Sequence, residues 1–203
     1  MEIIFATTNM GKLREIRAFL SDTGIEVISA IDAGVQSEVE ETGETFEENA
    51  VIKAESICKI AGKVVVAEDS GIEIDYLDKK PGVYSSRFMG EDTPYEIKNA
   101  KILELLKDVP EEKRTARYVS VFAAAFPDGT SFTERGQWEG IIGYEPKGTN
   151  GFGYDPIFYD IEKGKTAAQM ETDEKNKVSH RGKSLAKMKE HLIKELKKRG
   201  DLI

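Results

Sequence analysis

Residues 63–71 read Lys-Val-Val-Val-Ala-Glu-Asp-Ser-Gly, a hydrophobic run that ends in two adjacent carboxylates. The run over 63–67 has apolar residues on both faces of an extended chain, which predicts a strand buried in the middle of a sheet. Ligands of open α/β sheets bind in the crevice outside the carboxyl ends of the strands, so Glu68 and Asp69 mark a candidate site. Because side chains alternate along a strand, these two carboxylates are expected to point in opposite directions.

Strand and helix patterns alternate on the N-terminal side of this strand. Short apolar runs predict strands over residues 2–8 and 26–30. Apolar residues at helical spacing predict a helix over 13–20 between them, and a second helix over 45–61 opens with a capping box and ends at a glycine.

The C-terminal side adds a strand over 72–77 and a helix over 93–107 that opens with a second capping box. Two long strand patterns over 117–126 and 131–142 are joined by a Pro-Asp-Gly turn, which predicts a hairpin. A last helix is predicted over 182–199. This order of elements predicts an α/β fold with a mixed, twisted sheet and flanking helices.

Length and composition bound the class of protein. The 203 residues suit one domain, built as a single body or as two lobes, and 39% hydrophobic with 33% charged residues excludes a disordered chain. No apolar stretch approaches the roughly 18 residues of a membrane helix. The N-terminus reads as the start of a strand and lacks the marks of a signal peptide, so a cytoplasmic protein without membrane contact is expected.

Cysteine use and charge narrow the class further. Cys58 is the only cysteine, so an intramolecular disulfide is excluded, and its place on the inner stripe of a predicted helix favours a buried structural thiol. The formal charge of −8 argues against a general nucleic-acid binder. The charge is uneven, however, because ten Lys and Arg stand against six Asp and Glu over 171–203.

One candidate phosphate site lies between the first predicted strand and helix. Its residues are Thr7, Thr8, Asn9, Met10, Gly11 and Lys12. A helix N-terminus presents unpaired backbone N–H groups and a partial positive charge, so hydroxyl, amide and ammonium groups at this point suit phosphate oxygens. The spacing is not that of a P-loop. An ordinary capped turn with Asn9 as the helix cap is the alternative.

Carboxylates form a candidate metal site. An acidic run precedes and enters the second predicted helix: Glu38, Glu40, Glu41, Glu44, Glu47 and Glu48. A solvated face and the helix macrodipole explain most of these residues, but not the two in the loop, Glu40 and Glu41. Mg²⁺ takes one or two carboxylates with waters and phosphates, and a carboxylate beside it can take a proton from an attacking water. For Asp69-Ser70-Gly71 a capping turn is the alternative.

A third candidate site is rich in glycine. Three glycines surround two aromatic residues and an acid over 148–156. Glycine lets the backbone approach a flat ligand closely, an aromatic face is available for stacking, and Asp155 can accept hydrogen bonds. Lys175 and the run Ser179-His180-Arg181 follow, and they add donors for a carbonyl or a phosphate.

With these segments in order, the chain resembles the inosine triphosphate pyrophosphatase family, enzymes that remove non-standard purine nucleotides. The matching segments are Thr7 to Lys12, Glu40 with most of 43–50, Glu68 to Gly71, Pro81-Gly82 with Ser85 and Arg87, Asn150 to Pro156, and Glu174 to Asn176 with Ser179-His180-Arg181. Thr8 departs from the pattern, since glycine is common there. The resemblance implies an elongated, twisted sheet, two lobes around a central cleft, and a homodimer.

The resemblance also implies a reaction: Mg²⁺-dependent hydrolysis of the α–β phosphoanhydride of inosine and xanthosine triphosphates and their deoxy forms. Asp69 would take a proton from the attacking water and help hold the metal, with Glu40 as the other carboxylate ligand. Residues 7–12, Lys53 and Ser70 would bind the triphosphate. The base would stack on Phe152, and the remaining binding residues would be Gly153, Tyr154, Asp155, Lys175, His180 and Arg181.

Base selection has a physical basis in this assignment. A 6-keto purine offers an acceptor where adenine carries a donor amine, so cationic donors at the base edge disfavour ATP.

Two alternative functions stay open. One is a related pyrophosphatase for pyrimidine or modified nucleotides, and the other is a nucleic-acid-binding protein that uses the basic tail.

Overall fold

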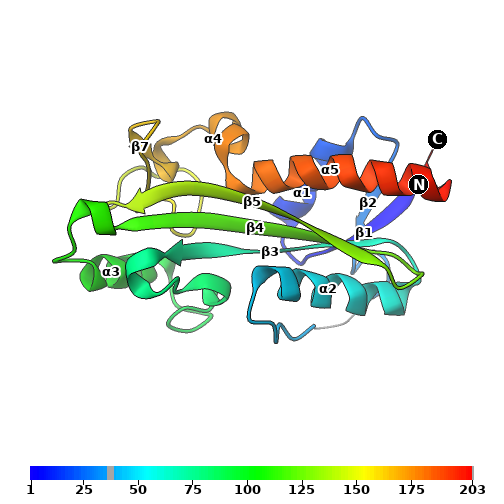
Figure 1. The fold of residues 1–203 in the computed structure, drawn as a ribbon, viewed down its shortest axis with the longest axis horizontal. Helices are drawn as coiled ribbons and strands as arrows, with labels where there is room; N and C mark the ends of the chain where they lie inside the picture. Colours follow the sequence, from blue (N-terminus) through cyan, green and yellow to red (C-terminus); the bar gives the residue numbers. More distant parts are fainter. Residues whose placement is uncertain (36–38, 203) are drawn as a thin grey trace. The chain divides into compact units, whose positions relative to one another are not determined.

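The computed structural model describes residues 1–35 and 39–202, so Glu38 lies outside the described residues. Seven strands form one sheet in the order β2-β1-β3-β4-β5-β6-β7 (Figure 1). The strands are β1 (Glu2–Ala6), β2 (Glu26–Ser29), β3 (Val65–Ile74), β4 (Thr115–Ala125), β5 (Ser131–Ile142), β6 (Phe158–Asp160) and β7 (Lys165–Thr166). The α-helices are α1 (Met10–Leu20), α2 (Phe46–Ala61), α3 (Tyr95–Leu105), α4 (Thr172–Val178) and α5 (His180–Arg199).

The sheet is mixed, as predicted. β1 pairs in parallel with both β2 and β3. β6 pairs antiparallel with β5 and with β7. β4 and β5 are neighbours joined by a tight turn, in which the Phe126 N–H donates to the Thr130 carbonyl at 2.9 Å. The predicted α/β class and the predicted hairpin are therefore confirmed.

β3 corrects the sequence prediction. It runs without a break over Val65–Ile74, where two strands were predicted over 63–67 and 72–77. Nearly all of its residues are buried, and a polar side chain is tolerated there when a neighbour satisfies it. Such a neighbour exists, because the Ser120 hydroxyl donates to Glu68 Oε1 at 2.8 Å. Glu68 and Asp69 thus lie in the middle of a strand and not at its carboxyl end.

The chain divides into two compact units. Unit 1 comprises residues 1–69, 120–136 and 183–203, and unit 2 comprises residues 70–119 and 137–182. No helix within the described ranges combines the length and the apolar character that a membrane crossing requires.

Unit 1 places helices on both faces of its part of the sheet. α1 and α5 lie on one face and α2 on the other (Figure 1). Phe5 of β1 and Val66 of β3 pack with Leu13 of α1 and with Met188 and Leu192 of α5 in one buried cluster. The apolar stripes predicted for these helices therefore face the sheet.

The ends of α2 match the sequence signals. The Glu48 N–H donates to Thr45 Oγ1 and the Thr45 N–H donates to Glu48 Oε2, both at 3.1 Å, which completes the predicted capping box. Gly62 closes the helix with a left-handed φ of 63°, a conformation that glycine adopts without a Cβ penalty. Cys58 on the inner stripe is buried, as predicted.

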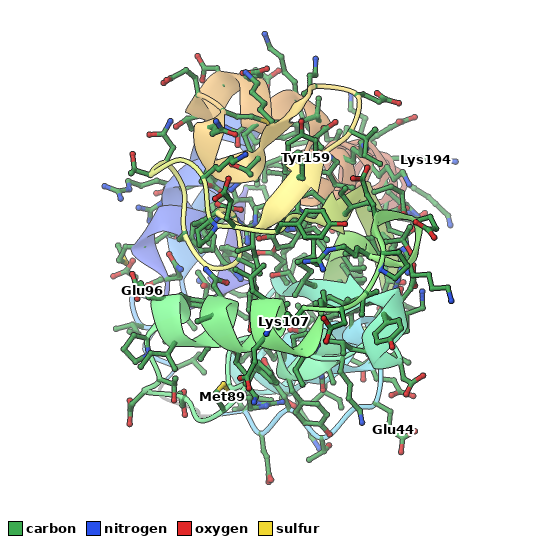
Figure 2. All side chains as sticks on the ribbon, turned by 90° about the vertical axis from the view of Figure 1, so that its left-hand side faces the viewer. Glu44, Met89, Glu96, Lys107, Tyr159 and Lys194 are labelled. Atoms are coloured by element: carbon green, nitrogen blue, oxygen red, sulfur yellow. The ribbon has the colours of Figure 1, made fainter. Side chains whose placement is uncertain are left out.

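Unit 2 is built around α3 and the long strands. Figure 2 shows this helix with Glu96 at its left-hand end. Ile102 of α3 packs in a buried cluster with Ile74 of β3, Trp138 of β5 and Phe158 of β6. α3 also anchors the glycine-rich loop, because Asn99 Nδ2 donates to the Gly153 carbonyl at 3.1 Å.

Three local predictions differ from the structure. The capping box at Thr93 is wrong, because the Thr93 hydroxyl donates back to the Met89 carbonyl and the helix cap is Pro94 with no side-chain hydrogen bond. α4 and the short strands β6 and β7 were not predicted, since each is shorter than the window that periodicity needs. α5 begins at His180, two residues before the predicted start.

Candidate active site

The turn into α1 is a capped helix start. Asn9 is the N-cap, and its Oδ1 accepts hydrogen bonds from the backbone N–H groups of Gly11 and Lys12 at 2.8 and 3.2 Å. The capped turn considered from the sequence is therefore present. Residues 8–10 are exposed, so the end of the helix is accessible to an anion.

Lys12 of this turn meets a buried carboxylate of β3. Its Nζ lies 3.2 Å from Glu68 Oε2, whose side chain is almost fully buried. The other oxygen of Glu68 accepts from the Ser120 hydroxyl, and the Ser184 hydroxyl donates to Ser120 Oγ at 3.0 Å. A chain of donors thus holds Glu68 in the orientation that meets Lys12.

Lys53 of α2 meets the other carboxylate of the pair. Its Nζ lies 3.7 Å from Asp69 Oδ1 and donates to the Glu68 carbonyl at 2.8 Å. It also donates to Glu41 Oε1 at 2.6 Å. Glu68 and Asp69 therefore point to different lysines, in the opposite directions that the alternation of a strand predicts.

The loop that carries Glu40 and Glu41 is held by the start of α2. The Gly43 N–H donates to Asn49 Oδ1 at 2.8 Å, and the Glu44 N–H donates to Glu48 Oε2 at 2.7 Å. A Cβ at residue 43 would lie 2.6 Å from the Glu48 Cβ, so only glycine fits this close approach. The loop conformation that presents the two carboxylates is thus set by side chains of the helix.

The donor chemistry of unit 1 fits a hard divalent cation. Glu40 is exposed and Asp69 is buried, and both offer carboxylate oxygens. Over residues 1–35 and 39–202, no three His, Cys, Asp or Glu side chains form a complete metal cage. Mg²⁺ does not need one, because it is commonly held by one or two carboxylates together with waters and phosphate oxygens.

Asp155 organises the candidate base site of unit 2. Its carboxylate is buried and accepts from the Phe152 N–H at 2.8 Å, from Lys175 Nζ at 2.5 Å and from the Tyr118 hydroxyl at 3.1 Å. Gly151 permits this arrangement, because its φ is +75° and a Cβ there would lie 2.0 Å from Asp155 Oδ2. Asp155 therefore fixes the loop and its neighbours.

Phe152 presents an open aromatic face. Its side chain is 59% exposed, and Lys175 Nζ and the Arg181 guanidinium lie 5.3 and 5.8 Å from its ring centroid. Tyr154 is buried instead, and its hydroxyl donates to the Ser85 carbonyl at 2.6 Å. Phe152 is thus suited to stacking, whereas Tyr154 anchors the loop.

Tyr118 connects His180 to this arrangement, and sequence reasoning missed it. Its ring stacks on the His180 ring with centroids 4.7 Å apart and planes 12° apart. Its only sequence signal was a place in the long strand pattern over 117–126, where an aromatic residue is ordinary. Ser120 was likewise not assigned a role from the sequence, and the lysine partners of Glu41 and Glu68 were not predicted, because these partners come from other elements.

Comparisons with known proteins show which proteins this chain is similar to. The model of the Ham1 family matches residues 3–191. A dITP/XTP pyrophosphatase of Bacillus licheniformis is 49% identical over 92% of this chain and 95% of its own length, and one of Bacillus subtilis is 46% identical over 92% and 94%.

Solved structures give the same result. A HAM1 protein from Coxiella burnetii has a TM-score of 0.90 at 39% identity, covering 96% of this chain and 99% of its own. A structure described as a nucleoside-triphosphatase and dITP/XTP pyrophosphatase from Mycobacterium abscessus has a TM-score of 0.80 at 41% identity, covering 93% and 98%. Both the sequence and the fold of this chain therefore match those of these proteins over nearly the whole chain.

Proposed function

Because this chain belongs to the Ham1 family, we propose that it hydrolyses non-standard purine nucleoside triphosphates to the monophosphate and pyrophosphate. The observation that carries the proposal is the match, over nearly full length, to relatives named dITP/XTP pyrophosphatase. Inosine and xanthosine triphosphates and their deoxy forms are the proposed substrates. The biological role is removal of these nucleotides from the cellular pool.

Unit 1 is proposed to bind the triphosphate. The exposed start of α1, residues 7–12, offers backbone N–H groups and the Lys12 ammonium, and Lys53 adds a further donor. Ser70, the first residue of unit 2, is proposed to bind the triphosphate as well. Both lysines are held by carboxylates before any phosphate arrives, at 3.2 Å for Lys12 with Glu68 and 2.6 Å for Lys53 with Glu41. Long flexible side chains held in this way lose less rotamer freedom when a ligand binds.

Asp69 is the proposed general base, and Asp69 and Glu40 are the proposed ligands of Mg²⁺. When bound, the ion would neutralise charge on the phosphate oxygens. Asp69 takes a proton from the water that attacks phosphorus, while Lys53, 3.7 Å away, orients its carboxylate. Exclusion of bulk water is helped by the burial of Asp69 within β3.

Unit 2 is proposed to bind the purine. Phe152 stacks on the base, and Lys175, His180 and Arg181 supply donors to its edge. Asp155, Gly153 and Tyr154 act through the loop, since Asp155 Oδ2 holds both Phe152 and Lys175. Donors at the edge match a 6-keto oxygen and leave the 6-amino group of ATP without an acceptor.

A substrate panel with product analysis tests the function. Inosine, xanthosine, guanosine, adenosine and uridine triphosphates are each incubated with Mg²⁺, and pyrophosphate release is separated from stepwise phosphate release. Inosine and xanthosine triphosphates are expected to give monophosphate and pyrophosphate fastest. A preference for uridine triphosphate would contradict the base assignment and favour a pyrimidine pyrophosphatase, and stepwise phosphate release would contradict the reaction.

Assembly and location are also proposed. A homodimer suits the large apolar side chains that unit 2 exposes, among them Tyr84, Met89 and Ile97. Light scattering is expected to give twice the mass of the 22.6 kDa chain, and a monomer at micromolar concentration would contradict it. The cytoplasm is the proposed location, because the nucleotide pool lies there.

A further inference from the structure

Tyr118 touches two groups of the proposed base site at once. Its ring lies 4.7 Å from that of His180 at an interplanar angle of 12°, so the two rings stack face to face. Its hydroxyl donates to Asp155 Oδ1 at 3.1 Å, and Asp155 Oδ2 accepts from Lys175 Nζ at 2.5 Å. Tyr118 thus contacts His180 directly and is linked to Lys175 through Asp155. Both His180 and Lys175 are proposed to donate hydrogen bonds to the base.

We propose that Tyr118 is a positioning residue that determines base specificity, by fixing the plane of the His180 ring and the place of the Asp155 and Lys175 pair. This inference rests on the proposed function, because it assigns His180 and Lys175 to the edge of the purine. Tyr118 itself acts through these two side chains.

The ring of Tyr118 is well suited to fix another ring. It is 7% exposed and belongs to the buried cluster of unit 2. Phe158 lies 4.6 Å from it and Trp138 lies 6.2 Å from it, measured between ring centroids. A ring packed on several sides keeps one orientation, so the imidazole stacked on it keeps one plane.

The orientation of His180 matters because hydrogen bonds are directional. A ring N–H donates best when the N–H···O angle exceeds about 150°, and the hydrogen bond weakens steeply when that angle falls below about 120°. A 6-keto oxygen is selected over a 6-amino group only while the donors point at it. Rotation of the imidazole would therefore reduce selectivity more than it reduces binding of the triphosphate.

The hydroxyl of Tyr118 contributes through Asp155. Burial raises the pKa of Tyr118 well above its ordinary value, and the neighbouring Asp155 carboxylate acts in the same direction. The hydroxyl therefore stays protonated at neutral pH and donates to Asp155. Because Asp155 Oδ2 also holds Phe152 and Lys175, the loss of one donor at Oδ1 is expected to have a smaller effect than the loss of the ring.

Two variants separate the ring from the hydroxyl, and a third serves as the control. Tyr118→Phe keeps the stack and removes the donor, whereas Tyr118→Leu removes both. Phe158→Leu makes a similar loss of volume in the same cluster, and the rings that Phe158 contacts are those of Tyr118 and Trp138. For each variant, kcat/KM is measured with inosine and adenosine triphosphates, and inorganic tripolyphosphate is measured as a competitive inhibitor without a base.

The expected result is a change in selectivity without a change in phosphate affinity. The ratio of kcat/KM for inosine over adenosine triphosphate should fall about tenfold in Tyr118→Leu and about twofold in Tyr118→Phe, with an unchanged inhibition constant for tripolyphosphate. Phe158→Leu removes one neighbour of the Tyr118 ring but leaves the ring and its hydroxyl in place, so the ratio should fall by much less than in Tyr118→Leu. Thermal unfolding of all variants shows whether Tyr118→Leu folds, and if it does not, Tyr118→Met, which fills more of the same volume without a ring, replaces it and should lower the ratio to a similar extent.

Three outcomes overturn the inference. They are a wild-type ratio in the folded Tyr118 variants, an equal fall in the ratio for Phe158→Leu, and a parallel loss of tripolyphosphate binding. The wild-type protein is measured first, because a protein that does not prefer inosine triphosphate contradicts the proposed function itself. A wild-type preference that survives in the Tyr118 variants contradicts only the role of Tyr118.

Discussion

Glu68 and Asp69 are adjacent in the sequence, yet they contact different lysines. Glu68 lies 3.2 Å from Lys12, and Asp69 lies 3.7 Å from Lys53, because successive side chains of β3 leave opposite faces of the sheet. Only Asp69 is therefore placed with the loop of Glu40 and Glu41 that Lys53 also contacts. The proposed division of labour, with Asp69 in the chemistry and Glu68 supporting Lys12, follows from this alternation.

Asp69→Asn is expected to abolish turnover while the protein stays folded. The amide cannot take a proton from water and is a poorer metal ligand, so kcat should fall by about 100-fold or more. Steady-state kinetics with inosine triphosphate and Mg²⁺ measure the effect. Asp22→Asn makes the same change at an exposed side chain that pairs with Lys189, and it should leave kcat unchanged. Near-normal activity of Asp69→Asn would remove Asp69 from the chemistry.

Lys12→Ala and Lys53→Ala are expected to weaken triphosphate binding. A charge-assisted hydrogen bond contributes about 1.5–3 kcal/mol, so KM for inosine triphosphate should rise about tenfold or more in each variant. Lys63→Ala is the matched control, because Lys63 is a half-exposed lysine paired with Glu2. Unchanged KM values in both test variants would argue against the phosphate site.

At the scale of elements, Arg114 joins the end of α3 to the end of β5. Its buried guanidinium donates to the carbonyls of Leu106 and Val109, which follow the helix, and to those of Ile142, the last residue of the strand, and Gly143. The ring of Tyr144 lies 4.3 Å from the guanidinium carbon. Burial lowers the pKa of Arg114 from its ordinary value, although the group stays protonated at any pH at which the protein is folded.

Arg114→Met is expected to lower the free energy of unfolding by about 3 kcal/mol, because several buried carbonyls lose their donor. Urea denaturation measures the change. The free energy of unfolding of Arg114→Lys should lie between those of Arg114→Met and wild type, since an ammonium reaches fewer of the carbonyls than the planar guanidinium. Arg14→Met, at an exposed position of α1, should change stability by less than about 0.5 kcal/mol. Equal stability of Arg114→Met and wild type would refute the anchoring role.

At the scale of the whole molecule, the uneven charge of the chain has a structural counterpart. Residues of α5 in the basic tail pair within unit 1, where Lys189 lies 2.6 Å from Asp22 and Arg199 lies 2.5 Å from Asp128. Carboxylates of the same unit therefore pair with part of the positive charge of the tail. The front of the tail, Lys175 with His180 and Arg181, belongs to the candidate base site of unit 2.

Both units contain carboxylates that stabilise the fold only while ionised. In unit 2, burial alone would raise the pKa of Asp75, but hydrogen bonds from Arg117, Lys79 and Thr115 outweigh it and hold that pKa well below its ordinary value. In unit 1, hydrogen bonds from Thr130 and Arg199 lower the pKa of Asp128 to about 2. A lowered folded pKa stabilises the protein above the unfolded pKa of about 3.9, and the effect is lost as the pH falls toward the folded value.

Stability is therefore expected to decrease from about pH 5 downward, and Asp75→Asn should remove part of that dependence. The measurement is the urea midpoint of both proteins between pH 7 and pH 2.5. The variant should be less stable than wild type at pH 7, and the two should converge as the pH falls. A difference that stays constant over this range would contradict an ionised role for Asp75.

Much of the fold and of the site follows from local patterns. Hydrophobic periodicity located the helices of 11 or more residues and the strands of 4 or more residues. Local signals of other kinds predicted the capping box of α2 and the hairpin of β4 and β5. The short β6 and β7 were missed, because two or three residues carry no periodicity. The break expected at Glu68 was wrong, because local polarity does not reveal that Ser120 of another strand satisfies the carboxylate.

The sequence by itself determined the α/β class, the order of the main elements, the family and the residue types of the candidate site. These follow from spacing along the chain, which is a property of neighbouring residues. Only the tertiary structure decided that Glu68 meets Lys12 and Asp69 meets Lys53, and that Tyr118 lies against His180. Such pairs join elements far apart in sequence, and their contacts depend on the strand order and on the packing of helices against the sheet.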